Sequence, residues 1–188
     1  MISLKEKYRK EVIPAMMEKF EYKNRMAVPK IEKVVVNTGF GRVVSEKTSK
    51  ERQKFSEAIL DDISLIVGQR PVLTKARKSI SGFKTRQGMP IGAKVVLRRK
   101  RMYDFLERLI SITLPRSRDF VGIKASAFDK EGNLTLGIKE HISFPEILLE
   151  KSKQIFSLET TVVTTAREQD KGLTLLKLMG FPIKVESK

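Results

Sequence analysis

The residues with the clearest chemical capacity are lysines and arginines gathered in one stretch, residues 69–101. No Asp or Glu occurs between Asp62 and Asp104. Cationic side chains without neighbouring carboxylates create a strong local field, which attracts phosphate groups and displaces their counterions. The stretch therefore predicts a polyanionic ligand. Its cations are Arg70, Lys75, Arg77, Lys78, Lys84, Arg86, Lys94, Arg98, Arg99, Lys100 and Arg101.

Residue types suited to catalysis are sparse. The absence of cysteine excludes disulfides, a thiol nucleophile and Cys-ligated zinc. The single histidine, His141, stands next to Ile142 and is interpreted as a packed or surface residue rather than a general base. Residues 129–132 contain acidic oxygens, but they lack the spacing of a calcium loop and are typical of a turn. We expect no catalytic residue, metal ligand or cofactor, with an RNA-modifying enzyme or nuclease as the alternative.

Composition narrows the class of partner. The chain has 188 residues, a net charge of +16 and 40% hydrophobic residues, which predicts one folded domain, residues 1–188, that binds nucleic acid or an anionic membrane. The cations do not gather on one amphipathic helix, which disfavours the membrane. No apolar run approaches a membrane-spanning length, and the first residues lack an apolar signal core. A cytoplasmic protein is predicted.

Hydrophobic periodicity predicts the elements that must carry these side chains. A break or kink is expected at Pro14, and Pro115 should end the third helix. The order predicts an α+β fold: a single, mostly antiparallel sheet with helices packed on one face and a long basic loop at about residues 77–90. The expected helices are 3–23, 48–67, 102–114 and 170–179, and the expected strands are 31–38, 71–76, 91–100, 120–128, 133–140 and 158–166.

Alternation along the predicted strands indicates an apolar face and an open polar face. Lys33 and Asn37 share the open face of the first strand, and Lys94 and Arg98 share that of strand 91–100. Strands 120–128 and 133–140 add Lys124, Ser126 and small residues. Such a face suits the phosphates and 2′-hydroxyls of folded RNA, whereas its few aromatic residues disfavour base stacking there.

The apolar residues near the tip of the loop leave two alternatives. Ile80, Phe83 and Met89 could reach a partner, or they could pack the loop on itself.

Several motifs, in order and spanning nearly the whole chain, resemble one family: number five of the L series of large-subunit ribosomal proteins, in its bacterial form. Residues 42–51, His141 and Ser143 depart from the family pattern. The matching motifs are residues 28–37, 68–71, 74–84, 88–92, 101–106, 115–116, 118–120, 132–133, 144–147 and 164–166.

The resemblance implies a structural, non-enzymatic role. Members of this family bind 5S rRNA in the central protuberance of the large subunit, contact P-site tRNA through the basic loop and contribute to an intersubunit bridge with a small-subunit head protein. Other large-subunit proteins and 23S rRNA are implied neighbours. By position in the motifs, the residues implied for rRNA are Lys33, Asn37, Gln69, Thr74, Lys75 and Lys94, and those for tRNA are Arg77, Lys78, Lys84 and Arg86.

Overall fold

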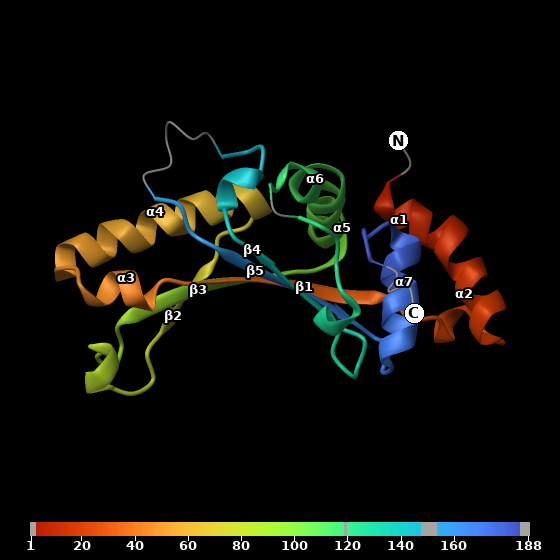
Figure 1. Ribbon diagram of the computed structural model, residues 1–188, viewed down its shortest axis with the longest axis horizontal. Coiled ribbons are helices and arrows are strands. Elements are labelled where there is room, and N and C mark those ends of the chain that lie inside the picture. The colour runs from red at the N-terminus through yellow and green to blue at the C-terminus, as the bar shows by residue number, and fades with distance from the viewer. Residues whose placement is uncertain (1–2, 119, 148–153, 185–188) are drawn as a thin grey trace. The chain divides into compact units, whose positions relative to one another are not determined.

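The computed structural model of the chain (Figure 1) describes residues 3–118, 120–147 and 154–184. Asp119 and residues 148–153 therefore lie outside the described part of the chain. The fold is α+β, with one five-stranded antiparallel sheet in the order β2-β3-β1-β5-β4. This confirms the predicted fold class. The strands are β1 Ile31–Gly39, β2 Val72–Lys75, β3 Pro90–Leu97, β4 Leu134–Ile138 and β5 Leu158–Thr164.

Helices precede the first strand, separate β1 from β2 and β3 from β4, and follow β5. Short 3-10 turns complete the described elements at Arg25–Ala27, Ser81–Phe83, Ala125–Ala127 and His141–Ser143. The α-helices are α1 Leu4–Lys7, α2 Ile13–Phe20, α3 Gly41–Ser45, α4 Ser49–Val67, α5 Arg99–Arg108, α6 Leu114–Arg116 and α7 Gln169–Met179.

Contacts group the chain into two compact units. The first takes in Met1–Val34, Leu97–Leu136 and Thr160–Lys188, and the second takes in Val35–Val96 and Gly137–Glu159. The single-domain organisation expected from the sequence stays a prediction.

In the first unit, α5 packs against α1, and α7 packs against the helical turn formed by Tyr8–Val12. The side chains of Val12, Met16, Phe105 and Leu175 are completely or almost completely shielded from solvent. Removing such apolar surface from water is the main favourable contribution to folding.

Both prolines that interrupt helical patterns follow a five-residue π-helical turn. Tyr8–Val12 precedes Ile13–Pro14, and Leu109–Thr113 precedes Leu114–Pro115. Ile13 and Leu114 each donate a backbone hydrogen bond to the carbonyl five residues earlier, so the wider turn accommodates a proline that has no N–H. The helix consequently continues to Arg116, and the prediction that it ends at Pro115 was wrong.

The second unit holds α4 along one side of β2 and β3 (Figure 1). A capping box opens α4, because Thr48 and Glu51 each satisfy a backbone N–H of the other. The hydrogen bonds from Thr48 hold the pKa of Glu51 below its ordinary value. Ile59, Ile63 and Ile66 form the buried stripe of the helix, and Gly68 ends it in the left-handed conformation with φ 68°.

The strand predicted at 120–128 does not form. Gly122 adopts φ +105°, which breaks an extended chain, and Ala125–Ala127 is a 3-10 turn. Only isolated bridges remain there among the described residues, from Ile123 to Ile183 and from Phe128 to Leu134. Lys124 and Ser126 therefore do not belong to a sheet face, and the prediction that they share one was wrong.

Strand β3 also ends earlier than expected. It stops at Leu97, Arg98 is the helix N-cap with φ −137° and ψ 162°, and α5 begins at Arg99. The prediction that the strand runs to Lys100 was wrong, because the basic run at 99–101 is the first turn of a helix. The short helix α3 was not predicted.

The turn before β4 is built by Asp129, as its sequence indicated. Asp129 Oδ1 accepts hydrogen bonds from the N–H groups of Glu131 at 3.0 Å and Asn133 at 2.7 Å. Partial burial acts to raise the pKa of Asp129, but the hydrogen bonds from Asn133, Glu131 and Gly132 hold it below its ordinary value. The carboxylate is thus committed to the turn.

Candidate nucleic-acid interface

The side of β1 and β3 that carries the polar residues is called the open face. In β1, Val34, Val36 and Thr38 are buried, while Lys33, Val35 and Asn37 are half-buried. In β3, Ala93, Val95 and Leu97 are buried, and Lys94 and Val96 are exposed, as is Arg98 beyond the strand. Because side chains alternate between faces, this pattern agrees with the predicted pairing of Lys33 with Asn37 and of Lys94 with Arg98 on one face.

Strand β2 adds Thr74 to the open face of the second unit. Val72 pairs with Lys94 and Thr74 pairs with Gly92 in an antiparallel register, and residues directly opposite each other share a face. A Cβ on Gly92 would lie 2.7 Å from Thr74 Oγ1 and 2.6 Å from the Thr38 carbonyl oxygen. Glycine is therefore required at this position for the three strands to pack closely.

Lys75 stands apart from the other residues implied for rRNA. The register shifts between Thr74 and Lys75, so that Lys75 pairs with Pro90. Such a bulge interrupts the alternation of side chains, and Lys75 is exposed at the point where the strand ends. Gln69 lies before β2, and its Nε2 reaches the Val96 carbonyl at 3.5 Å.

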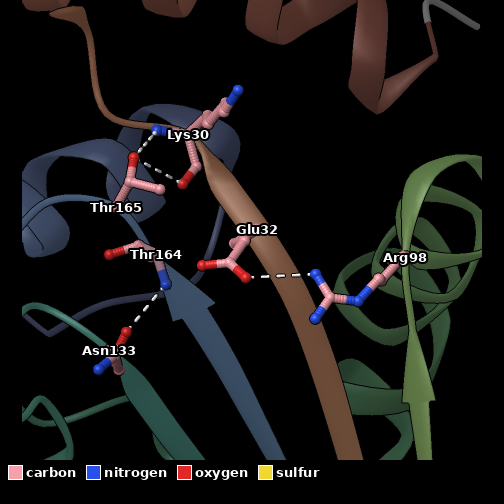
Figure 2. A network of polar contacts seen from close by, with 6 residues as sticks. All are labelled: Lys30, Glu32, Arg98, Asn133, Thr164 and Thr165. Carbon is pink, nitrogen blue, oxygen red and sulfur yellow. Dashed lines mark hydrogen bonds and ion pairs between the residues drawn. The ribbon is translucent and has the colours of Figure 1, made fainter.

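Two polar groups of the open face each contact a carboxylate. In the second unit, Asn37 Nδ2 donates to Glu159 Oε2 at 3.3 Å. In the first unit, Arg98 is 3.2 Å from Glu32 Oε1 (Figure 2). Both members of the Arg98–Glu32 pair are about half exposed, so the pair contributes little to stability.

Lys33 and Lys94 of the open face differ from Asn37 and Arg98 in their contacts with carboxylates. Within the described part of the chain, neither Lys33 nor Lys94 forms an ion pair. Their ammonium groups are thus available to phosphate, whereas Arg98 and Asn37 would have to be shared with or released by a carboxylate. The sequence reasoning did not identify Glu32 and Glu159 as neighbours of the candidate site.

Hydroxyl groups extend the open face onto β4 and β5. In the first unit, Thr135 Oγ1 and Thr161 Oγ1 lie 3.2 Å apart. In the second unit, exposed Gly137 has nothing within 4 Å of where a Cβ would stand. Alternation in 158–166 could have indicated Thr161 and Glu159 from the sequence, because buried Leu158, Thr160 and Val162 leave those two on the other face.

A shallow hollow opens beside Asn37 in the second unit. Its volume is about 470 Å³. Its lining combines a carboxylate, an amide, an ammonium group and two glycines, so that polar atoms and bare backbone are presented together. The residues concerned are Asn37, Gly39, Gly137, Lys139, Ser157 and Glu159.

A polar network joins the strand ends of the first unit (Figure 2). Thr165 Oγ1 accepts from the Lys30 N–H at 3.1 Å and lies 3.4 Å from the Lys30 carbonyl oxygen. The Thr164 N–H donates to Asn133 Oδ1 at 2.9 Å. These bonds tie together the start of β1, the end of β5 and the residue that precedes β4.

The segment between β2 and β3, residues 76–89, is called the basic loop. It continues the hairpin, because the Ala76 N–H donates to the Met89 carbonyl and the Gly88 N–H donates to the Ala76 carbonyl. Ile80 and Thr85 exchange both backbone hydrogen bonds, at 3.1 and 3.2 Å. The four cations implied for tRNA lie on the basic loop, and all four are exposed: Arg77, Lys78, Lys84 and Arg86.

The apolar residues of the basic loop differ in whether they pack the loop or could reach a partner. Met89 is buried, so it belongs to the packing of the protein and does not reach a partner. Ile80 and Phe83 are 49% and 73% exposed, so they do not pack the loop on itself.

His141 is a packed residue of the second unit. Its ring is buried and stacks on Phe156 with 3.9 Å between ring centres. Its Nδ1 accepts from the Phe156 N–H at 3.3 Å, and its Nε2 is 3.6 Å from Asp62 Oδ2. Burial lowers the pKa of His141, while burial and then the charge of Asp61 raise the pKa of Asp62.

Neither a metal site nor a membrane-crossing helix emerges from the described residues. No group of three or more His, Cys, Asp and Glu side chains there is arranged to hold a metal ion. None of the helices in that part combines the length and apolar composition that a bilayer crossing requires.

Comparison with known proteins matches this chain to two adjoining family models. Residues 24–86 match the model described as ribosomal protein L5, and residues 90–183 match the model described as the C-terminus of the same ribosomal protein family.

Full-length relatives agree with these matches, and each carries the name large ribosomal subunit protein uL5. The one from Halothermothrix orenii is 50% identical over 97% of this chain and 98% of its own length. The one from Desulforapulum autotrophicum is 52% identical over 98% of this chain and 99% of its own. The one from Syntrophomonas wolfei is 52% identical over 98% and 100%.

Proposed function

The chain belongs to the ribosomal protein L5 family, and on that premise we propose that the open face of its sheet binds 5S rRNA in the central protuberance. Membership makes the protein a structural constituent of the large ribosomal subunit and not an enzyme. It works in the cytoplasm, where bacterial ribosomes are found, as predicted.

The observation that carries the rRNA proposal is the alternation of β1 and β3. It sets Lys33 and Lys94 on the open face, and neither lysine forms an ion pair among the described residues. Lysines in that condition neutralise phosphates and release counterions. Asn37, Thr74 and Gln69 supply the neutral donors and acceptors that 2′-hydroxyls require.

The basic loop carries a second part of the proposal. Arg77, Lys78, Lys84 and Arg86 extend from a hairpin that lies beyond the ends of β2 and β3 (Figure 1). The resemblance to the family extends this part to P-site tRNA, with a small-subunit head protein as partner at an intersubunit bridge. It also brings 23S rRNA and other large-subunit proteins as neighbours. The acid-free charge of the loop supports the tRNA contact.

A binding comparison tests the proposal. The purified chain should retard folded 5S rRNA in a native gel at physiological salt, and it should not pellet with vesicles rich in anionic lipid under the same conditions. Retardation of an unrelated folded RNA with equal affinity would reduce the interaction to non-specific charge. Binding to vesicles but not to 5S rRNA would contradict the proposal.

A further inference from the structure

An open cleft of the second unit lies between the basic loop and α3. Its volume is about 930 Å³, which is ample for a nucleobase with its sugar. Ile80, Gly82, Phe83 and Thr85 form the loop side, and Gly41 and Ser45 form the α3 side. Neither the open face nor the cations implied for tRNA explains why such a cleft should have an aromatic wall.

The wall is held in place before any ligand arrives. Ser81–Phe83 forms a 3-10 turn that Lys84 closes in the left-handed conformation, with φ 50°. The paired backbone bonds of Ile80 and Thr85 close the base of this turn, and the Gln87 N–H donates to Ser79 Oγ at 2.9 Å. A ring presented by a fixed backbone loses little conformational entropy when a ligand stacks on it.

The charge of the cleft favours an anionic occupant. Arg42, Arg77, Lys78 and Lys84 are among its lining residues, and of the described residues that line it only Glu46 is acidic. An apolar or aromatic wall with a cationic rim matches an RNA nucleotide, whose base has a π-face and whose phosphates are negative. An apolar peptide would bury the wall but leave the cations without partners.

We propose that this cleft receives an unpaired RNA base that stacks on Phe83, while the flanking phosphates contact the cations of its rim. The inference rests on the proposed function of the basic loop as an RNA contact, and it specifies unpaired rather than double-helical RNA. Phe83 supplies the stacking surface and Ile80 the adjoining apolar contact. Lys84, next in the chain, is placed to neutralise a phosphate beside the stacked base.

The absence of tryptophan from the chain allows a direct optical test. Phe83→Trp places a single indole on the wall of the cleft, and Leu65→Trp places one on α4, where Leu65 is 60% exposed. The probes are an RNA stem-loop with unpaired loop bases and a blunt RNA duplex of equal length. The stem-loop should quench Phe83→Trp fluorescence strongly, the duplex only weakly, and neither should quench Leu65→Trp selectively.

Affinity provides the second measurement. Phe83→Ala should bind the stem-loop about tenfold more weakly than the parent chain while binding the duplex equally, because base–aromatic stacking is lost. Phe83→Trp should retain the parent affinity. Equal quenching by both RNAs, or parent affinity in Phe83→Ala, would overturn the inference. Quenching by an acidic peptide but not by the stem-loop would also overturn it and would assign the cleft to protein.

The RNA-binding role proposed for the basic loop can be tested separately from base stacking on Phe83. If Lys78→Ala, Lys84→Ala and Arg86→Ala together weaken stem-loop binding but Phe83→Ala does not, the loop contacts RNA and the base-stacking inference is wrong. If the triple variant binds the stem-loop as tightly as the parent, the RNA role of the loop is wrong and the inference falls with it.

Discussion

The side-chain amide of Asn37 donates to the carboxylate of Glu159 at 3.3 Å, between residues 122 positions apart in the chain. Asn37 is one of the residues implied for rRNA, and the negative charge of Glu159 repels phosphate. An rRNA that uses Asn37 must therefore share it with Glu159 or replace the carboxylate as its partner.

Glu159→Gln should consequently bind 5S rRNA more tightly, by about two- to tenfold at low salt. The substitution keeps a hydrogen-bond acceptor for Asn37 and removes one negative charge from the open face. Gel retardation of 5S rRNA measures the change, and Glu57→Gln, on the exposed surface of α4, controls for net charge. Weaker binding by Glu159→Gln would instead make the carboxylate a direct RNA contact.

Replacing Lys78, Lys84 and Arg86 with alanine should weaken tRNA binding to ribosomes that contain the variant, while 5S rRNA binding by the free chain stays unchanged. The reason is that these cations lie on the basic loop and not on the open face. A triple substitution of Lys50, Lys54 and Lys130, which are exposed elsewhere, provides a control with the same loss of charge. Equal losses of tRNA and 5S rRNA binding would contradict the division of roles.

Gly92→Ala should destabilise the protein by about 2 kcal/mol or more, because overpacking between fixed strands is costly. The added carbon would lie 2.6 Å from the Thr38 carbonyl oxygen and 2.7 Å from Thr74 Oγ1. Urea denaturation measures the free energy of unfolding.

Gly137→Ala is the matched control for this substitution, since nothing lies within 4 Å of its added carbon. It should leave the free energy of unfolding nearly unchanged and lower 5S rRNA affinity if the backbone of β4 approaches the RNA. Equal stability of the Gly92→Ala and parent chains would show that the strands can move apart at this point.

His141 predicts a loss of stability on acidification. Burial lowers the pKa of His141 in the folded chain, so the unfolded chain takes up the proton first as the pH falls through about 6.5. The free energy of unfolding should therefore be highest above that pH and fall between about pH 7 and pH 5.5. Asp62 acts in the opposite sense, because its raised pKa adds stability as the carboxylate becomes protonated.

Urea midpoints at the two pH values measure this effect, and His141→Phe keeps a flat ring against Phe156 while removing the titration. The parent chain should lose more stability between the two pH values than His141→Phe. The same pH dependence in both chains would exclude His141 as its source.

The sequence predicted the elements that depend on local pattern. Helix α4 begins beside Thr48, where the sequence predicted it, because the capping box of Thr48 and Glu51 is a contact over three residues. The open face of β1 followed from alternation around Val34 and Val36. Apolar alternation at Val121 and Ile123 resembled a strand equally well, but Gly122 with φ +105° prevents one. No sequence pattern within that segment predicts this backbone conformation of Gly122.

Contacts between distant residues could not be predicted in the same way. The partnership of Asn37 with Glu159 and that of Arg98 with Glu32 depend on which strands are neighbours. The register shift at Lys75 separates it from Thr74, its neighbour in the same motif. The cleft beside Phe83 requires α3, a five-residue helix that the sequence pattern did not predict.

The central claim is that the open face binds 5S rRNA through Lys33 and Lys94, and the salt dependence of binding tests it most directly. The slope of log K against log salt should fall in magnitude by about one in Lys33→Ala and again in Lys94→Ala, because each loses one phosphate contact. Lys50→Ala, on α4, should keep the parent slope. Parent slopes in both Lys33→Ala and Lys94→Ala would contradict the claim.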